Sequence, residues 1–250
     1  HALVIGSGLV SFEVCDLLRQ RGLAVTVVMR EKYFGEPLLD EQTGGLVEKA
    51  FEKIGVKIIR ETLVEEVMGK KSVEQIKLSS GAIISGDLIL ASIGMIFNLA
   101  WLKQAGLDTG RGILANQCLE TSLPDIWTAG DCAEYQDLVL GDRIQLFNWM
   151  HAQKQGLTAG ANMAASRLNA EKTAFSLVSC YTSFSAGINL AFIGDTRPNT
   201  QKNTVLQGDP ATGSYAKIFT RQNVVVGALL VNRTKEIMGI RKMIEKGEKI

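Results

Sequence analysis

A glycine-rich turn near the start of the chain has the residue types that bind a phosphate group. The apolar run 2–5 ends at Gly6, and Gly8 and Ser11 follow at the spacing Gly-x-Gly-x-x-Ser. The first glycine permits a tight turn, the second lets a pyrophosphate approach the backbone, and the third position must be small so that a helix packs on the strand. We expect the pyrophosphate to lie at the N-terminus of that helix. The expected contacts come from Gly6, Ser7, Gly8, Leu9 and Val10.

The surroundings of this turn are those of a β-α-β unit. Apolar residues at helical spacing follow the turn over 10–18, and the apolar run 24–29 after Gly22 predicts a second strand. The alternative interpretation is an ordinary strand-turn-helix that binds no ligand.

The end of the second predicted strand carries the residues that distinguish NADH from NADPH. An acidic residue there binds the ribose 2′-hydroxyl of NAD, whereas an arginine favours the 2′-phosphate of NADP. Met29 stands where the acid is usual, and Arg30 and Glu31 follow it. The signal is divided, with a small preference for NADPH, and a solvated charged loop is the alternative.

The rest of the chain predicts an α/β fold with a doubly wound, Rossmann-like parallel sheet. A third strand and a returning strand are expected at 56–59 and 87–92, with a β-meander inserted at 62–84. Helices are expected at 41–54, 99–105 and 148–168, and a strand at 126–131. A C-terminal α+β unit is expected to have strands at 174–179, 190–194, 215–221 and 224–231 and a helix from 237 to 244.

Composition narrows the class of protein. The 250 residues carry a net charge of +1, which gives no reason to expect nucleic acid or a membrane surface as a partner. The longest uncharged run, 88–102, is too short to span a bilayer. The four cysteines have no metal-ligand spacing and only two histidines occur, so we expect no metal site and a reducing, cytoplasmic location.

Three motifs follow one another along the chain: the glycine turn with Glu13, then Ala91-Ser-Ile-Gly94, then Thr128-Ala-Gly-Asp131. Together they resemble the pyridine nucleotide-disulphide oxidoreductase family of FAD proteins. They are similar, in order, to its NAD(P) fingerprint, its crossover motif and its second FAD motif. The pattern Trp149-x-x-Ala152-x-x-Gln155-Gly156 looks like the helix that backs the flavin, and residues 174–250 look like the C-terminal domain of the ferredoxin-, rubredoxin- and nitrite-reductase-like branch.

The resemblance implies FAD and NAD(P)H as cofactors and a homodimer. It implies an NAD(P)-binding domain at 1–93, the C-terminal half of an FAD-binding domain at 94–170 and an α+β interface domain at 171–250. It places Glu13 near the nicotinamide and Asp131 on the ribityl chain. The alternatives are an early-helix acid favoured by the helix dipole and an aspartate that caps a turn or helix. Further implied cofactor contacts are Ile93, Gly94, Gly130 and Trp149.

The sequence also departs from the family. The separate FAD fingerprint with which such proteins begin does not occur in these 250 residues, so we expect a fragment or one piece of a divided protein. Its exposed surface around Asp131 and Trp149 should then be apolar. Thioredoxin-reductase-like enzymes carry a C-x-x-C in the NAD(P) domain, and glutathione- and lipoamide-type enzymes carry a C-terminal catalytic histidine. Both types are disfavoured, because residues 2–93 contain only Cys15 and no histidine follows His151.

Three functional hypotheses follow. In the first, the chain belongs to an FAD-dependent NAD(P)H:acceptor oxidoreductase that passes hydride from nicotinamide to flavin and then reduces a small redox protein, oxygen, a peroxide or a disulphide. The cofactors carry that chemistry, and no catalytic side chain is identified. In the second, the chain is a non-catalytic nucleotide-binding and oligomerisation module that needs a flavin-bearing partner. In the third, it is a cysteine-based disulphide or peroxide reductase.

Overall fold

A parallel sheet lies at the N-terminal end of the computed structural model, which describes residues 1–198 and 201–250. Its strands pair in the order β3-β2-β1-β7. The two central strands, β1 and β2, are almost wholly buried and apolar, as strands covered on both faces are. The predicted Rossmann-like parallel sheet is confirmed. It is not doubly wound, because helices cover one face and the meander covers the other. Its strands are β1 (Ala2–Ile5), β2 (Val25–Val28), β3 (Val56–Ile59) and β7 (Leu88–Ala91).

Two layers cover opposite faces of this sheet. Helices α1 (Leu9–Gln20) and α2 (Glu41–Lys53) pack on one face, where Val4 and Val27 join Phe12 and Phe51 in the core. Leu3 points to the other face and packs under a three-stranded antiparallel sheet. That sheet confirms the predicted meander and consists of β4 (Val64–Met68), β5 (Gln75–Leu78) and β6 (Ile83–Ser85).

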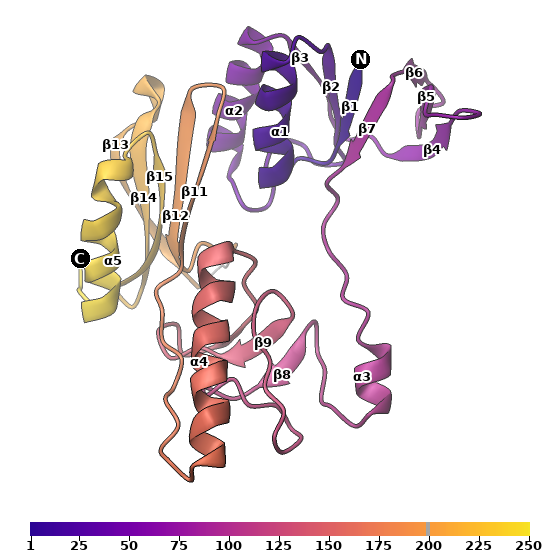
Figure 1. Ribbon diagram of the computed structural model, residues 1–250. Coiled ribbons are helices and arrows are strands. Elements are labelled where there is room, and N and C mark those ends of the chain that lie inside the picture. The colour runs from indigo at the N-terminus through magenta and orange to yellow at the C-terminus, as the bar shows by residue number, and fades with distance from the viewer. Residues whose placement is uncertain (199–200) are drawn as a thin grey trace.

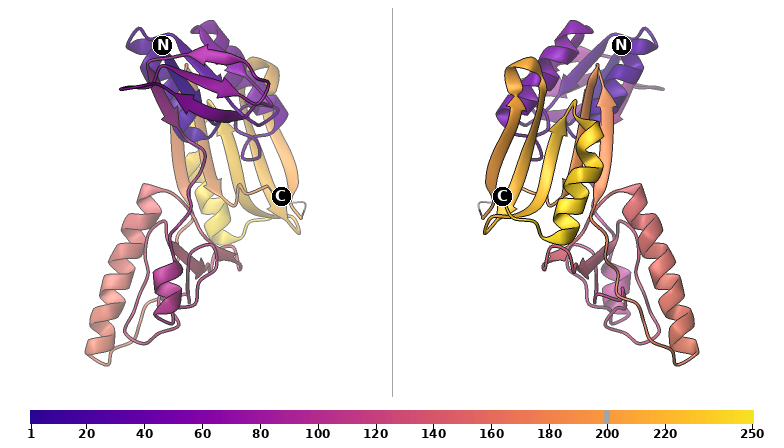
Figure 2. Two further views of the ribbon diagram at one scale, coloured as in Figure 1. Left: turned by 90° about the vertical axis from the view of Figure 1, so that its right-hand side faces the viewer. Right: turned by 90° about the vertical axis from the view of Figure 1, so that its left-hand side faces the viewer.

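A five-stranded antiparallel sheet packs on the outer side of α1 and α2. Phe192, Tyr215 and Leu229 of this sheet belong to the same core as Phe12 and Phe51, so the two units share one core. Figures 1 and 2 show the resulting layers: meander, parallel sheet, two helices, antiparallel sheet and α5. The elements are β11 (Cys180–Ser185), β12 (Ile188–Gly194), β15 (Val224–Val231), β14 (Ser214–Arg221) and β13 (Asn203–Asp209), with η1 (Pro210–Thr212), η2 (Thr234–Glu236) and α5 (Ile237–Lys246).

A smaller unit lies between β7 and β11 in the sequence. An extended segment, 92–99, leads into it, as Figure 1 shows. Its strands pair in the order β10-β9-β8, and the buried residues Tyr135, Ala159 and Phe175 form its core. The elements are α3 (Ala100–Gln104), β8 (Ile113–Ala115), β9 (Ala133–Gln136), β10 (Arg143–Ile144) and α4 (Trp149–Arg167).

Two predicted strands do not form. Residues 126–131 form a loop in place of the predicted strand. Within this loop, Trp127 pairs with Glu120 in an isolated β-bridge. Residues 174–179 are extended but unpaired, because Phe175 and Val178 pack in two different cores and the segment crosses from one to the other. Strand pairing begins at β11 instead, and neither β11 nor β13 is predicted from the sequence.

Buried polar contacts join α2 to the antiparallel sheet. The hydroxyl of Tyr215 lies 2.8 Å from Oγ1 of Thr43, and both residues are fully buried. Beside them, Lys217 forms an ion pair with Asp40, whose side chain also caps the N-terminus of α2. These contacts fix the orientation of the nucleotide unit on the sheet.

We expect Tyr215→Phe to lower the free energy of unfolding by about 1 kcal/mol, because it removes one buried hydrogen bond and keeps the ring. Urea unfolding followed by circular dichroism measures the change. Tyr33→Phe is the matched control, since the Tyr33 hydroxyl makes no hydrogen bond within the described residues. Equal stability of the two variants would contradict this account of the shared core.

Candidate dinucleotide-binding site

The turn after β1 brings the predicted phosphate-binding residues to the start of α1. Gly6 has a φ of +103°, a left-handed conformation that favours glycine, and its amide donates to the carbonyl of Val28 at 2.9 Å. A Cβ on Gly6 would lie 2.2 Å from the carbonyl oxygen of Ser92, so no side chain fits there. The turn therefore touches the segment that leaves β7.

The space above the turn is open. Gly8 is the N-cap residue of α1, no side chain caps the helix, and a Cβ on Gly8 would meet only Oγ of Ser92 at 4.0 Å. The first amides of the helix, at Leu9 and Val10, are thus left for a ligand, and the helix dipole favours an anion. Ser11 is fully buried against the strand. These residues fit a pyrophosphate.

The end of β2 places one cation and one carboxylate beside each other. The side chain of Met29 lies in the core, whereas Arg30 is 76% exposed and forms an ion pair with Glu31 at 3.0 Å. Oε2 of Glu31 is buried and has no hydrogen-bond partner within the described residues. Buried Glu48 holds the following loop by accepting from the amide of Phe34. The site therefore has both an arginine, which favours the 2′-phosphate of NADP, and a carboxylate, which favours the 2′-hydroxyl of NAD. The choice between NADH and NADPH stays a prediction.

The second motif adjoins the first. Ile93 is 75% exposed, and its Cγ2 atom lies 3.7 Å from the position of a Cβ on Gly6. Gly94 has a φ of +100°, and no atom lies within 4 Å of the position that a Cβ would occupy there. Glu13 lies further along α1 and is exposed. Its Oε1 accepts a hydrogen bond from the hydroxyl of Ser183 on β11 at 2.7 Å, so the antiparallel sheet orients this carboxylate.

The third motif lines an apolar groove. Gly130 has a φ of +85°, and its amide donates to Oε1 of buried Gln155 at 2.7 Å. Gln145 donates to the carbonyl of Asp131 at 2.9 Å. The carboxylate of Asp131 makes no hydrogen bond within the described residues, so it remains able to accept from a ligand hydroxyl. A cavity of about 670 Å³ is lined by Phe97, Asp131, Cys132, Phe147, Asn148, Trp149 and Ala152.

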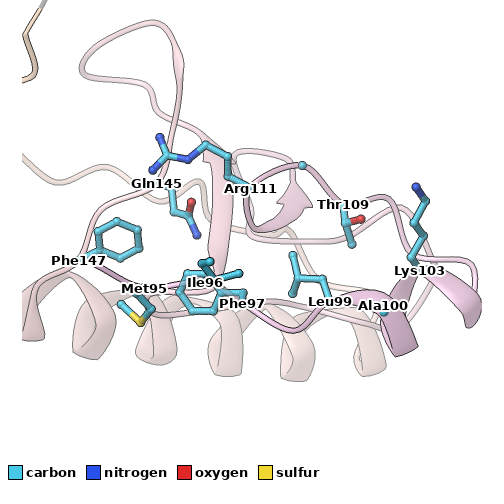
Figure 3. Close-up of a pocket in the computed structure, with 11 residues that line it drawn as sticks. Met95, Ile96, Phe97, Leu99, Ala100, Lys103, Thr109, Arg111, Gln145 and Phe147 are labelled. Carbon is cyan, nitrogen blue, oxygen red and sulfur yellow. The ribbon is translucent and has the colours of Figure 1, made fainter. Parts of the chain in front are cut away.

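Large apolar side chains are exposed beside this groove. Trp149, the first residue of α4, is 78% exposed, and Ile96 is 97% exposed. The rings of Phe97 and Phe147 stack at a centroid distance of 6.1 Å. Figure 3 shows the adjoining pocket of about 460 Å³, where Met95, Ile96 and Phe97 lie below the side chain of Arg111. The apolar surface predicted around Asp131 and Trp149 is confirmed.

His151 is a packed residue rather than a wall of the groove. Its Nε2 atom lies 2.8 Å from the Tyr135 hydroxyl, which donates to Asp137 at 3.0 Å. Burial lowers the pKa of His151 to about 4, so the ring is neutral at pH 7. This agrees with a structural role in the core beneath α4.

Two of the four cysteines are in surroundings that disfavour redox chemistry. All four are free. Burial raises the pKa of Cys15 to about 12 and also raises that of Cys180, which disfavours the reactive thiolate. Among the described residues, no group of His, Cys, Asp and Glu could hold a metal ion, and no helix is long and apolar enough to cross a membrane.

Sequence reasoning missed two contacts that shape the site. Gln155 belongs to the helix motif named above, but the sequence does not indicate that its side chain accepts a hydrogen bond from the amide of Gly130. The carbonyl of Ser92 excludes a side chain at Gly6, and no sequence signal marks a backbone atom.

The glycine turn at the end of β1, the open helix N-terminus and the parallel sheet define a dinucleotide-binding α/β protein. Comparison with known proteins narrows this class. The family model described as pyridine nucleotide-disulphide oxidoreductase matches residues 1–156, and that of the rubredoxin NAD+ reductase C-terminal domain matches residues 185–248. The chain belongs to the pyridine nucleotide-disulphide oxidoreductase family, as the resemblance predicts.

Individual relatives are longer than this chain. It is 28% identical over 245 residues to a nitrite reductase [NAD(P)H] of Bacillus subtilis (strain 168), covering 98% of this chain and 29% of the relative. Among solved structures, the ferredoxin reductase for the CYP199A2 system from Rhodopseudomonas palustris has a TM-score of 0.87 at 23% identity, covering 100% of this chain and 60% of that one. The covalent putidaredoxin reductase–putidaredoxin complex has a TM-score of 0.85 at 22% identity, covering 98% and 58%. Both structures support the fold.

We expect Gly8→Ala to weaken the binding of NADH or NADPH by about tenfold, or 1.4 kcal/mol, without loss of folding. The added Cβ has room in the free protein but enters the space above the turn. Nucleotide fluorescence titration measures the affinity, and thermal unfolding checks the fold. Gly45→Ala is the control, because a Cβ there meets nothing within 4 Å on α2. Unchanged affinity in Gly8→Ala would place the nucleotide elsewhere.

Proposed function

We propose that this chain is part of an FAD-dependent NAD(P)H:acceptor oxidoreductase. The observation that carries the proposal is the open glycine turn, in contact with the segment 92–94 and complemented by the free Asp131 carboxylate in the apolar groove. When bound, FAD supplies the chemistry by accepting hydride from reduced nicotinamide and passing electrons to a second acceptor.

The residues of the chain bind and orient these groups. The first turn of α1 would hold the nicotinamide dinucleotide through its pyrophosphate, and Glu13, oriented by Ser183, would lie on the nicotinamide side. Asp131 would accept hydrogen bonds from the ribityl hydroxyls of FAD. Phe147 and Trp149, which line the groove, would exclude water from the flavin ring.

We propose that a flavin-bearing lobe covers the exposed groove, either from the same polypeptide or from a partner. The support is the exposed apolar surface around Trp149, since surfaces of this kind are usually covered by another protein surface. If that lobe belongs to another protein, the exposed apolar surface supports the second hypothesis, in which this chain is a non-catalytic module that needs a flavin-bearing partner.

A small redox protein is the acceptor that we propose. The match of residues 185–248 to a rubredoxin NAD+ reductase domain and the similarity to a reductase solved with putidaredoxin support it. Oxygen, a peroxide or a disulphide is the alternative acceptor. Homodimerisation and a cytoplasmic location stay predictions.

The experiment compares the full-length gene product with this 250-residue chain. We expect the full-length product to be yellow, to be bleached anaerobically by NADH or NADPH, and to reduce an added iron–sulfur redox protein. In that product, Asp131→Ala should lower the bound FAD. Asp108→Ala is the matched control, because exposed Asp108 lies outside the groove.

The outcomes separate the hypotheses. A colourless full-length product that oxidises neither nucleotide would contradict the oxidoreductase proposal. If no longer product exists and the 250-residue chain binds nucleotide without flavin, the module hypothesis is correct. Full FAD content in Asp131→Ala would remove the role given to this carboxylate.

A further inference from the structure

The carboxylate of Asp195, directly after β12, gathers three cations. The side chain is fully buried and accepts from Nε of Arg197 at 2.9 Å. Nζ of Lys202 and Nη2 of Arg221 lie 3.1 and 3.4 Å from its oxygens. Burial alone would raise the pKa of Asp195, but the bonds from Arg197 and Lys202 hold it below its ordinary value. The carboxylate is therefore charged at pH 7.

The backbone at Asp195 is fixed to the antiparallel sheet. Its amide donates to the carbonyl of Val226 at 2.8 Å, and a Cβ on Gly227 would lie only 2.4 Å from its carbonyl oxygen. Both partners belong to β15, which is paired on both sides. This charged cluster is thus part of the sheet that shares a core with the nucleotide unit.

Two of the three cations also contact the smaller unit. Nη2 of Arg197 donates to Oδ2 of Asp142 at 3.3 Å, and Nη1 of Arg221 donates to the carbonyl of Leu140 at 3.4 Å. Asp142 and Leu140 lie in the loop 137–142, which joins β9 to β10. One buried carboxylate therefore holds both arginines where they bind this loop.

The same loop is connected to the helix that lines the apolar groove. Asp137 accepts from the amide of Leu140 at 2.6 Å and from the hydroxyl of Tyr135 at 3.0 Å. The Tyr135 oxygen in turn lies 2.8 Å from Nε2 of His151. His151 is in the first turn of α4, two residues after Trp149. A continuous chain of polar contacts thus runs from the sheet to the groove.

Few other features attach the smaller unit to the rest of the molecule. It has a core of its own, whereas the nucleotide unit and the antiparallel sheet share one. The chain enters it through the extended segment 92–99 and leaves it through the unpaired segment 174–179. Val139 of the loop packs on the core under α5. Figures 1 and 2 show the smaller unit beyond one end of the antiparallel sheet.

We propose that Asp195 is a positioning residue that fixes the smaller unit on the antiparallel sheet. It thereby sets where the apolar groove lies relative to the glycine turn. The catalytic consequence rests on the proposed function, in which hydride passes from a nicotinamide held at the turn to a flavin held in the groove. A misplacement of about 1 Å between reacting groups can slow a reaction about a hundredfold. The orientation of the two bodies does not rest on that function.

Residual dipolar couplings of the isotope-labelled 250-residue chain measure this orientation without a cofactor. We expect the amide couplings of the native chain to fit one alignment tensor across both bodies. In Asp195→Asn the smaller unit should lose that common fit, because its two arginine contacts are no longer held. Glu120→Gln is the matched control and should keep the common fit, since the ion pair of Glu120 with Lys172 lies outside the contact with the sheet.

A second variant covers the case in which Asp195→Asn does not fold. The double variant Arg221→Gln/Asp142→Asn removes both contacts with the loop and leaves Asp195 paired with Arg197 and Lys202. Circular dichroism checks that it is folded. We expect it to lose the common alignment tensor as well.

Stopped-flow absorbance of the full-length gene product measures the consequence for hydride transfer from NADH or NADPH to FAD. We expect Asp195→Asn to lower the rate per bound flavin by about ten- to a hundredfold. The FAD content and the dissociation constant of the nucleotide should stay unchanged, because Asp131 and the glycine turn keep their own contacts. A purely structural role would lower the amount of folded, FAD-loaded protein and leave the rate per flavin unchanged.

The outcomes that overturn the proposal are distinct from those that overturn the proposed function. A common tensor that persists in Asp195→Asn or in the double variant excludes the positioning role, and so does a native chain whose two bodies need separate tensors. An unchanged rate per flavin in Asp195→Asn, beside an active native product, also excludes it. If the native product transfers no hydride, the proposed function fails and the dipolar couplings alone decide the role of Asp195.

Discussion

The contact between the turn at Gly6 and the carbonyl of Ser92 is the constraint on which the site depends. Ile5 and Ala91 are paired in neighbouring parallel strands, and both strands end at the same edge of the sheet. Only a residue without a side chain lets the two chain segments meet there. This meeting puts the start of α1 next to residues 92–94, at the carboxyl edge where open α/β sheets bind their ligands.

The core that α1 and α2 share with the antiparallel sheet holds the carboxyl edge of the parallel sheet in place. Phe12 on α1 packs with Phe51 on α2 and with Phe192 and Tyr215 of the antiparallel sheet. Because α1 is held between two sheets, its N-terminus, where we propose that the pyrophosphate binds, is fixed in place. The same packing brings β11 against Glu13, so a residue far along the chain orients a carboxylate of the nucleotide unit. The C-terminal sheet thus contributes to the site as well as to stability.

Local signals predicted much of the fold and the site. The glycine turn, the parallel strands and the meander follow from spacing and from alternation over a few residues. The remaining features depend on contacts between residues that lie far apart in the sequence. Phe175 and Val178 look like strand residues but anchor a crossing segment in two cores. The exposed residues of β13 carry no apolar alternation. The role of Gln155 depends on an amide that lies 25 residues earlier in the chain.

Amide NMR of the isotope-labelled chain during titration with NADH and NADPH tests the central claim most directly. The account predicts that the amides of Gly8, Leu9 and Val10 shift together with those of Ile93 and Gly94, while the amides of β13 stay unchanged. No shift with either nucleotide, or the largest shifts outside the carboxyl edge of the parallel sheet, would contradict the account.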